Sequence, residues 1–181
     1  MSEQHNDVLF VFPGQGSQYL GMGRDLCAAY PVARALYDRA ADVLGYNLFE
    51  LCDSGPEEQL NLTRHTQPAL LTHHIACLEV FRELTDGQVQ PALAAGHSLG
   101  EYSALVTAGS LGFEAALDLV RQRGELMGAQ LRVERQRFAL RLGLGEDARR
   151  RGKDDVGAAV DEPVPRLGVA AQDSIDQPAV A

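Results

Sequence analysis

Residues 92–107 read Ala-Leu-Ala-Ala-Gly-His-Ser-Leu-Gly-Glu-Tyr-Ser-Ala-Leu-Val-Thr, and this stretch decides the fold. The short run of small residues through Gly96 predicts a strand, and the pattern from Leu99 to Thr107 predicts a helix. Between them lies a pentapeptide of the form G-x-S-x-G, which makes a tight strand-to-helix turn. Glycines on both sides let the backbone fold back without Cβ clashes. The stretch therefore predicts a serine, Ser98, exposed at the end of a sheet.

Ser98 is the candidate nucleophile at this turn. The backbone N–H of Leu99 points to the same spot from a helix N-terminus, where an oxyanion is favoured. A chance match within a stretch rich in glycine and alanine is the competing interpretation. The strand before the motif and the helix after it favour the turn.

The segments around this turn predict an α/β fold. An apolar, β-branched and aromatic run at Val8–Phe12 predicts a strand buried on both faces, as in a parallel sheet. Strand, helix, strand, helix in this order points to the α/β class. Further helices are expected over residues 24–44 with a break at Pro31, over 66–84 starting at Thr66-Gln67-Pro68, and over 113–127.

The pattern weakens beyond Met127. Segments 138–142 and 166–171 are candidate strands, with an uncertain helix or a loop over 146–160. Residues 1–130 hold 16 acidic and seven basic side chains, whereas residues 131–181 hold nine of each. The shift in composition suggests a boundary near residue 130.

Composition excludes several functional classes. The formal net charge of −9 argues against nucleic-acid binding, which requires a basic surface. No apolar run is long enough to cross a membrane, and the first residues do not resemble a signal peptide. Three scattered cysteines, Cys27, Cys52 and Cys77, form neither a disulfide framework nor a metal site. These features predict a reduced, cytoplasmic protein without a metal.

A serine needs a base to accept its proton, and the histidines do not supply an obvious one. All five histidines precede Ser98, whereas α/β-hydrolase-like chains carry the base after the nucleophile. His97 adjoins Ser98, but adjacent side chains diverge, so a supporting or substrate-facing position is favoured. His73 and His74, within the 66–84 helix, are expected to be surface residues or to have local partners.

Arg123 is the candidate anion-binding residue. On a helical projection it falls within an extended apolar arc of residues 113–127. Arg121 falls at the polar margin, three residues from Asp118, where a weak surface ion pair is expected. An arginine directed toward a core needs an anion, and a bidentate carboxylate would satisfy it. An internal Asp or Glu partner, or a stem that reaches water, remains the alternative.

Three motifs together resemble the malonyl-CoA:acyl-carrier-protein transacylase family, which includes the acyltransferase domains of polyketide synthases. The resemblance covers about residues 7 to 130. Its motifs are Phe-Pro-Gly-Gln-Gly-Ser-Gln at 12–18, Thr-Gln-Pro-Ala-Leu at 66–70 and Gly-His-Ser-Leu-Gly-Glu-Tyr-Ser-Ala-Leu at 96–105, continuing through 108–109 to Arg123-Gly124.

The resemblance implies an α/β-hydrolase-like parallel-sheet subdomain and the start of a ferredoxin-like small subdomain. It implies that Ser98 takes a malonyl group from coenzyme A and passes it to the phosphopantetheine thiol of acyl carrier protein, in fatty-acid or polyketide synthesis. The N–H groups of Gln15 and Leu99 would form the oxyanion hole, and Arg123 would pair with the malonyl carboxylate. No tightly bound cofactor is implied.

The resemblance becomes poor after about residue 130. We therefore expect an acyltransferase core over residues 1–130, and a partial ferredoxin-like subdomain or poorly ordered tail over 131–181. The catalytic histidine of the family would follow Ala181, so the chain is expected to be truncated and poorly active. A fragment, an interrupted gene and a polypeptide completed by another chain all remain open. A serine esterase or thioesterase, or a non-catalytic carrier-protein-binding fragment, is the alternative function.

Overall fold

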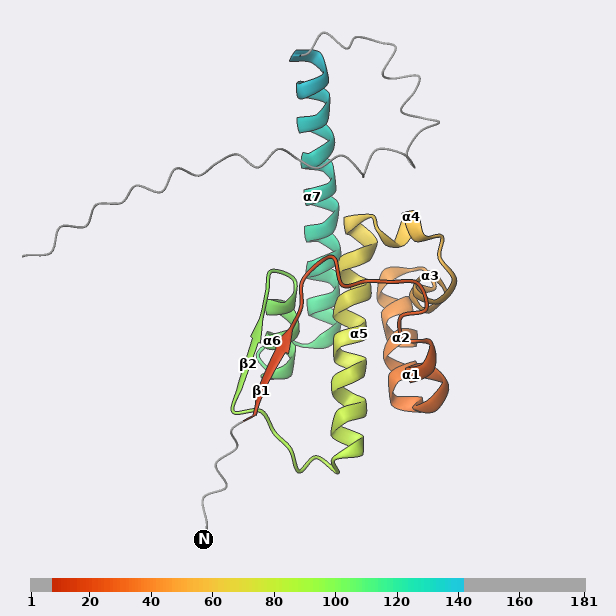
Figure 1. Ribbon diagram of the computed structural model, residues 1–181, viewed down its shortest axis with the longest axis vertical. Coiled ribbons are helices and arrows are strands. Elements are labelled where there is room, and N and C mark those ends of the chain that lie inside the picture. The colour runs from red at the N-terminus through yellow and green to blue at the C-terminus, as the bar shows by residue number, and fades with distance from the viewer. Residues whose placement is uncertain (1–7, 142–181) are drawn as a thin grey trace, which may run out of the picture. The chain divides into compact units, whose positions relative to one another are not determined.

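The computed structural model describes residues 8–141, and within them it describes side chains over residues 8–134. This part contains two strands and seven helices (Figure 1). Their bounds are β1 Leu9–Phe12, α1 Arg24–Ala29, α2 Pro31–Leu44, α3 Leu48–Ser54, α4 Glu57–Leu60, α5 Thr63–Leu84, β2 Leu93–Gly96, α6 Gly100–Thr107 and α7 Phe113–Arg141.

The two strands form a small parallel sheet. Residues Leu9 to Phe12 of β1 lie opposite Leu93 to Gly96 of β2. α6 packs against both strands, and α5 packs against α6 and α7 (Figure 1). The α/β class with a parallel sheet is therefore confirmed.

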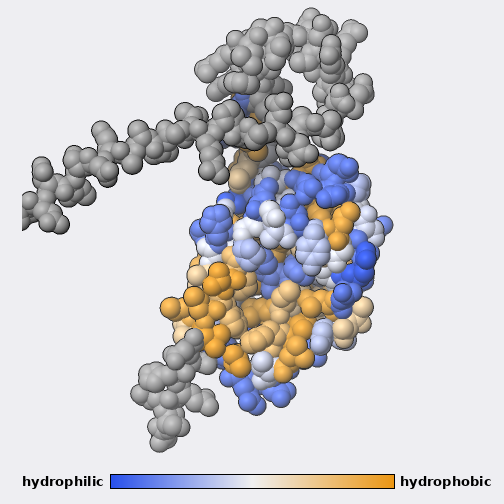
Figure 2. Space-filling view, viewed as in Figure 1, coloured by the Kyte–Doolittle hydropathy of each residue, from blue (hydrophilic) through white to orange (hydrophobic). Residues whose placement is uncertain are grey.

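The exposure of β1 corrects the expectation of a strand buried on both faces. Phe12 is buried, but Leu9 and Val11 are 53% and 66% exposed, and Leu93 on β2 is 70% exposed. A continuous apolar run is buried on both sides only where layers cover both faces of the sheet. Within residues 8–141 helices cover one face, and apolar side chains gather over β1 and β2 on the surface seen in Figure 2.

The break predicted at Pro31 is confirmed. Tyr30 has an extended backbone between α1 and α2, and Pro31 is the first residue of α2. Proline fits this position because its fixed φ suits the first helical turn and its missing N–H has no intrahelical partner there.

α5 carries much of the core, and its start lies three residues before the predicted one. The helix begins at Thr63 and contains Pro68 in its second turn. The Thr66 hydroxyl donates to the carbonyl oxygens of Leu60 and Leu62, at 2.6 and 3.1 Å, which anchors the first turn. The apolar stripe of Leu71, Ile75 and Leu78 on this helix is buried, because α5 lies between neighbouring helices.

α7 extends well past the predicted end at Met127. It continues through residue 130 to Arg141, so the strand predicted over 138–142 is wrong for its described residues, 138–141, which are helical. Residues 129–141 contain neither glycine nor proline and are rich in strong helix formers, so the helix continues. The elements predicted over 146–160 and 166–171 lie outside the described residues.

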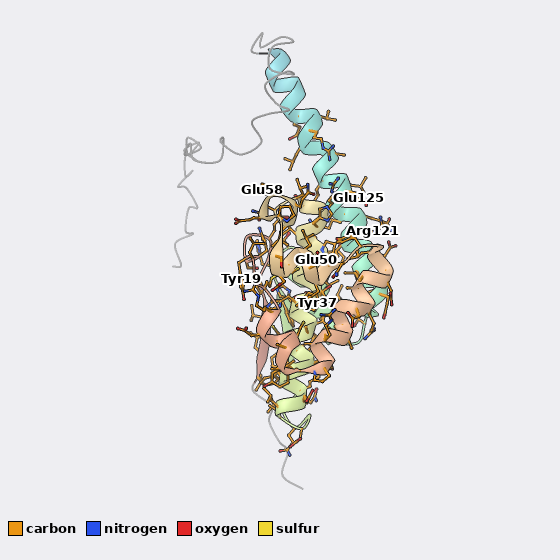
Figure 3. The ribbon with its side chains drawn as sticks, turned by 90° about the vertical axis from the view of Figure 1, so that its right-hand side faces the viewer. Tyr19, Tyr37, Glu50, Glu58, Arg121 and Glu125 are labelled. Atoms are coloured by element: carbon orange, nitrogen blue, oxygen red, sulfur yellow. The ribbon has the colours of Figure 1, made fainter. Side chains whose placement is uncertain are left out.

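Tyr37 on α2 occupies the interior between helices (Figure 3). Its ring meets Phe49 edge to face at a centroid distance of 5.6 Å, and its hydroxyl is 3.2 Å from Nδ1 of His73 on α5. Burial of a side chain of this size stabilises the fold by about 2 kcal/mol. No helix within residues 8–141 combines the length and apolar character needed to cross a lipid bilayer.

Candidate active site

The turn at Ser98 is built by glycines that no other residue could replace. A Cβ at Gly96 would lie 2.0 Å from the backbone of Gly100, and a Cβ at Gly100 would lie 2.2 Å from the carbonyl oxygen of Phe12. Ser98 itself has a φ of 54°, a left-handed conformation that is uncommon for a residue with a Cβ. Strain of this kind is held in place by the surrounding backbone and is concentrated at functional sites.

The residue after the serine begins α6. Leu99 is fully buried and is the N-cap of this helix, while Ser98 is half-buried. The Leu99 amide therefore belongs to the positive end of the helix dipole, next to the Ser98 side chain.

The loop after β1 lies directly against this turn. A Cβ at Gly14 would meet Nδ1 of His97 at 2.8 Å and the His97 carbonyl oxygen at 2.9 Å. The Gln15 side chain donates to the Thr63 hydroxyl at 3.3 Å, and Gln18 donates to Asn61 at 2.8 Å. These bonds tie the loop to the segment where α5 begins.

Arg123 reaches the Ser98 side chain from α7. Its Nη2 donates to Ser98 Oγ at 3.0 Å, and its Nη1 donates to Oε1 of Gln67 at 2.9 Å. The guanidinium carbon also lies 5.9 Å from the centre of the Tyr102 ring. The guanidinium thus meets two neutral oxygens, and no carboxylate within residues 8–134 forms an ion pair with it.

Gln67 is a site residue that sequence reasoning did not single out. It is 1% exposed, and its Nε2 donates to the Met127 sulfur at 3.4 Å, which leaves Oε1 facing Arg123. The sequence signal that could have identified Gln67 is a polar side chain among the apolar positions of a buried helix. In the sequence, however, the same segment reads as a helix start.

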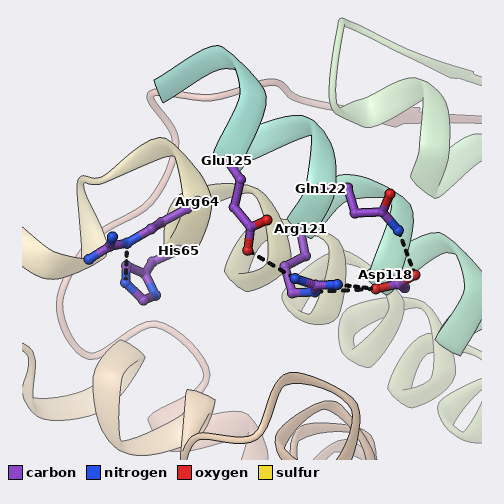
Figure 4. Close-up of polar contacts among 6 residues, drawn as sticks. All are labelled: Arg64, His65, Asp118, Arg121, Gln122 and Glu125. Carbon is purple, nitrogen blue, oxygen red and sulfur yellow. Dashed lines mark hydrogen bonds and ion pairs between the residues drawn. The ribbon is translucent and has the colours of Figure 1, made fainter. Parts of the chain in front are cut away.

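Arg121 behaves as a surface residue, as predicted. It bonds to Asp118 at 2.6 Å and to Glu125 at 2.9 Å (Figure 4). Hydrogen bonding to Arg121 lowers the pKa of Asp118. Only Arg123, two residues further on, turns toward Ser98.

The histidines on α5 have partners other than Ser98. His74 Nδ1 is 2.9 Å from the Ser103 hydroxyl, and His73 contacts Tyr37, so both have local partners as predicted. His97 is exposed and its side chain lies against Gly14. No histidine within residues 8–134 hydrogen-bonds to the Ser98 hydroxyl.

Burial shifts the pKa values of one histidine and two cysteines in this part of the chain. It lowers the pKa of His74 to about 4 and raises the pKa of Cys27 to about 11 and of Cys52 to about 12. These thiols therefore stay protonated near neutral pH and are poor nucleophiles. Over the described residues, no group of three or more His, Cys, Asp or Glu side chains is arranged to hold a metal ion.

Comparisons with known proteins identify the family of this chain. The acyl transferase domain family matches residues 9–170. A malonyl CoA-acyl carrier protein transacylase of Bacillus subtilis (strain 168) is 45% identical over 149 residues, which are 82% of this chain and 46% of the relative. An acyl carrier protein S-malonyltransferase structure from Vibrio cholerae is 52% identical with a TM-score of 0.63, over 66% of this chain and 38% of that one.

A further solved structure is a malonyl-transacylase in complex with a type II polyketide synthase acyl-carrier protein. It is 54% identical with a TM-score of 0.64, over 67% of this chain and 38% of that chain. The chain thus spans less than half the length of the relatives it matches. Because the family match extends over most of its residues, the chain belongs to the acyl transferase domain family.

Proposed function

We propose that this chain carries the nucleophile-bearing part of a malonyl-CoA:acyl-carrier-protein transacylase. The observation that supports the proposal most is the 3.0 Å contact between Arg123 Nη2 and Ser98 Oγ. A cation within hydrogen-bond distance of the nucleophile, without an ion-pair partner among the described residues, suits an acyl group that itself carries a carboxylate.

In the first half-reaction Ser98 Oγ attacks the thioester carbonyl of malonyl-CoA. The oxygen–carbon bond forms, the carbon–sulfur bond breaks, and the coenzyme A thiol leaves with a proton. The backbone N–H groups of Leu99 and Gln15 would stabilise the oxyanion of the tetrahedral intermediate. The serine proton needs a base, and since no histidine within residues 8–134 hydrogen-bonds to the Ser98 hydroxyl, we expect this step to be slow in the present chain.

Arg123 selects the acyl group. In a malonyl ester the carboxylate carbon is only three bonds from the serine oxygen, so a guanidinium beside Oγ is within its reach. A bidentate pair would then replace the Arg123–Ser98 hydrogen bond while Gln67 keeps its own bond to Arg123. His97, exposed beside the loop, would face the substrate.

In the second half-reaction the phosphopantetheine thiol of acyl carrier protein attacks the malonyl ester and releases Ser98. Malonyl-CoA is a substrate in this scheme, the pantetheine arm arrives with the partner protein, and the chain itself holds no tightly bound cofactor. The relative solved with an acyl-carrier protein supports this choice of partner. The reaction would serve fatty-acid or polyketide synthesis in the cytoplasm, where cysteines such as Cys27, Cys52 and Cys77 stay free.

We further propose that residues 1–130 form the N-terminal part of an α/β-hydrolase-like subdomain, and that residues 131–181 begin a ferredoxin-like one. The strand–turn–helix around Ser98, with its parallel sheet, supports the first assignment. The continuous helix α7 would join the two parts.

The esterase or thioesterase alternative is not favoured, because it gives Arg123 no role and the named relatives are malonyl transacylases. A non-catalytic fragment that binds carrier protein predicts binding without any acylation of Ser98. Comparing malonyl-CoA with acetyl-CoA as acyl donors separates these two alternative functions from the transacylase.

The test incubates the 181-residue chain with malonyl-CoA or acetyl-CoA and follows its intact mass. We expect slow malonylation at Ser98 that exceeds acetylation, no adduct on the Ser98→Ala variant, and little onward transfer to holo acyl carrier protein. Rapid malonylation with full transfer would contradict the expected lack of a base, and no Ser98 adduct at all would contradict the proposal.

Gln67 variants sharpen the test, because each changes the side chain that accepts a hydrogen bond from Arg123. Gln67→Glu places a carboxylate that competes with malonate, and Gln67→Ala frees the guanidinium. We expect the ratio of malonylation to acetylation to fall about tenfold or more in both, since a charged hydrogen bond contributes about 1.5–3 kcal/mol. Gln122→Ala, an exposed amide on α7 that bonds to Asp118, should leave this ratio unchanged.

A further inference from the structure

A groove of about 260 Å³ lies beside the candidate active site, between the start of α5 and the middle of α7. Arg64 and Arg132 line it from the two helices, together with Gly124 and Gly128 of α7. Two of the lining residues connect the groove to the site. Gly124 directly follows Arg123, and Thr63, another lining residue, accepts a hydrogen bond from the Gln15 side chain.

The two arginines of this groove differ from the other arginines within residues 8–134. Five of these form ion pairs with carboxylates, namely Arg24, Arg34, Arg39, Arg82 and Arg121, and Arg123 bonds to Gln67 and Ser98. Arg64 and Arg132 have no such carboxylate within this part of the chain, and both are exposed. In a protein with a net charge of −9, two such cations facing one groove are a local exception.

The neighbouring groups leave this positive charge available. Toward the residues whose side chains the structure describes, Arg64 hydrogen-bonds only through its Nε, which donates to Nε2 of His65 at 3.0 Å (Figure 4). Its terminal nitrogens therefore remain as donors. Glu125 also lines the groove, but its carboxylate is bonded to Arg121 at 2.9 Å (Figure 4).

We propose that this groove binds the phosphate of the phosphopantetheine arm while the thioester lies at Ser98. Arginine pairs well with phosphate because its planar fork donates two parallel hydrogen bonds. Coenzyme A and holo acyl carrier protein present the same arm, so the chemistry recognised is a pantetheine phosphate from either source. The inference rests on the proposed function for the position of the thioester, and its own test measures binding alone.

The test uses the 181-residue chain with Ser98→Ala, which cannot be acylated, and titrates it calorimetrically with 4′-phosphopantetheine and with pantetheine. We expect phosphopantetheine to bind about tenfold more tightly at low salt, and raised ionic strength to reduce the difference. The double variant Arg64→Gln/Arg132→Gln should bind both compounds equally. The matched control Arg24→Gln/Arg34→Gln removes the same charge at exposed, carboxylate-paired positions and should keep the tenfold preference.

Equal binding of the two compounds by the parent chain, or a preference that survives in the Arg64→Gln/Arg132→Gln variant, would overturn the proposal. Circular dichroism of each variant checks that the fold is retained. Titrations with coenzyme A and with holo acyl carrier protein then identify the source. If the Arg64→Gln/Arg132→Gln variant loses affinity for only one of these two substrates, the groove serves that substrate. If it loses affinity for both, the groove binds the shared arm.

The outcome is separable from the proposed function. If Ser98 is never malonylated but the arginine-dependent preference for phosphopantetheine holds, the transacylase assignment fails and the groove stands. If malonylation depends on Ser98 and Arg123 while the preference is absent, the groove fails and the function stands.

Discussion

The Ser98 hydroxyl and the Arg123 guanidinium lie 3.0 Å apart although 25 residues separate them along the chain. The other partner of Arg123 is the neutral amide of Gln67, which is almost fully buried. A carboxylate at this position would neutralise the guanidinium and compete with an anionic substrate. An amide oxygen orients the guanidinium and leaves its charge intact, which suits a site that must bind a carboxylate.

A second residue-scale feature is the buried pair of His74 and Ser103 behind β1. His74 hydrogen-bonds to Ser103 on α6 and packs against Phe12 of β1. It also adjoins His73, whose positive charge would disfavour protonation of His74. Burial lowers the pKa of His74 to about 4, from 6.5 in the unfolded chain. Because the folded state disfavours the protonated form, the associated stability is present above pH 6.5 and is lost as the pH falls toward 4.

We therefore predict that the His74→Gln variant is less sensitive to acid than the parent chain. Between pH 7 and pH 4.5 the parent should lose about 2 kcal/mol more of its free energy of unfolding, because protonation of His74 in the unfolded chain adds to the titration of carboxylates common to both. Urea unfolding at the two pH values measures this difference. An equal loss in both proteins would show that His74 does not titrate in this way.

At the scale of elements, the site depends on close approaches between backbones. Gly96 and Gly100 let β1, β2 and α6 meet at the turn. On α7, a Cβ at Gly124 would lie 2.7 Å from the Thr63 carbonyl oxygen and 2.8 Å from Cα of Arg64. This contact sets how close α7 lies to the start of α5, and therefore where Arg123 stands relative to Gln67.

Gly124→Ala is predicted to destabilise the fold by about 2 kcal/mol or more, because its Cβ would meet backbone that cannot move aside cheaply. Gly128→Ala, one turn further along α7, has nothing within 4 Å of its Cβ. We expect it to stabilise the chain by about 0.5–1 kcal/mol, since alanine is the better helix former. Denaturant unfolding of the two variants tests the contact, and equal effects would contradict it.

At the scale of the whole molecule, the described part leaves one face of its sheet uncovered. Leu9, Val11 and Leu93 are each more than half exposed, on neighbouring positions of the parallel pair. Apolar patches of this kind on soluble proteins mark contacts with other polypeptide or lead to association. The relatives are more than twice as long as the matched segment, so their chains contain further residues available to cover such a face.

The 181-residue chain is therefore predicted to bind an apolar dye such as ANS at this face. Val11→Thr should reduce the dye fluorescence without lowering the free energy of unfolding, because the side chain is 66% exposed and threonine keeps the β-branched shape. Leu126→Gln, at an exposed leucine of α7, serves as the control and should leave the fluorescence unchanged. Equal fluorescence of Val11→Thr and the parent would place the dye elsewhere.

The elements predicted well are those whose signals are local. The Pro31 break, the buried stripe of α5 and the strand before Ser98 follow from proline chemistry and from apolar periodicity. The errors arose where local signals were ambiguous. Thr66-Gln67-Pro68 predicts a helix start, whereas tertiary packing and the Thr66 hydrogen bonds begin α5 at Thr63. Residues 138–141, predicted as part of a strand, belong to α7.

Sequence by itself determined the turn at Ser98 and placed Arg123, rather than Arg121, toward the core, because both depend on residues close together along the chain. Only the tertiary structure decided that Gln67, 56 residues from Arg123, holds its guanidinium against Ser98, and that Arg64 and Arg132 line one groove. Such contacts depend on how α5, α6 and α7 pack. The close approach of other backbone segments to Gly124 and Gly100 sets the distances between these helices, and the sequence pattern of one helix does not specify those distances.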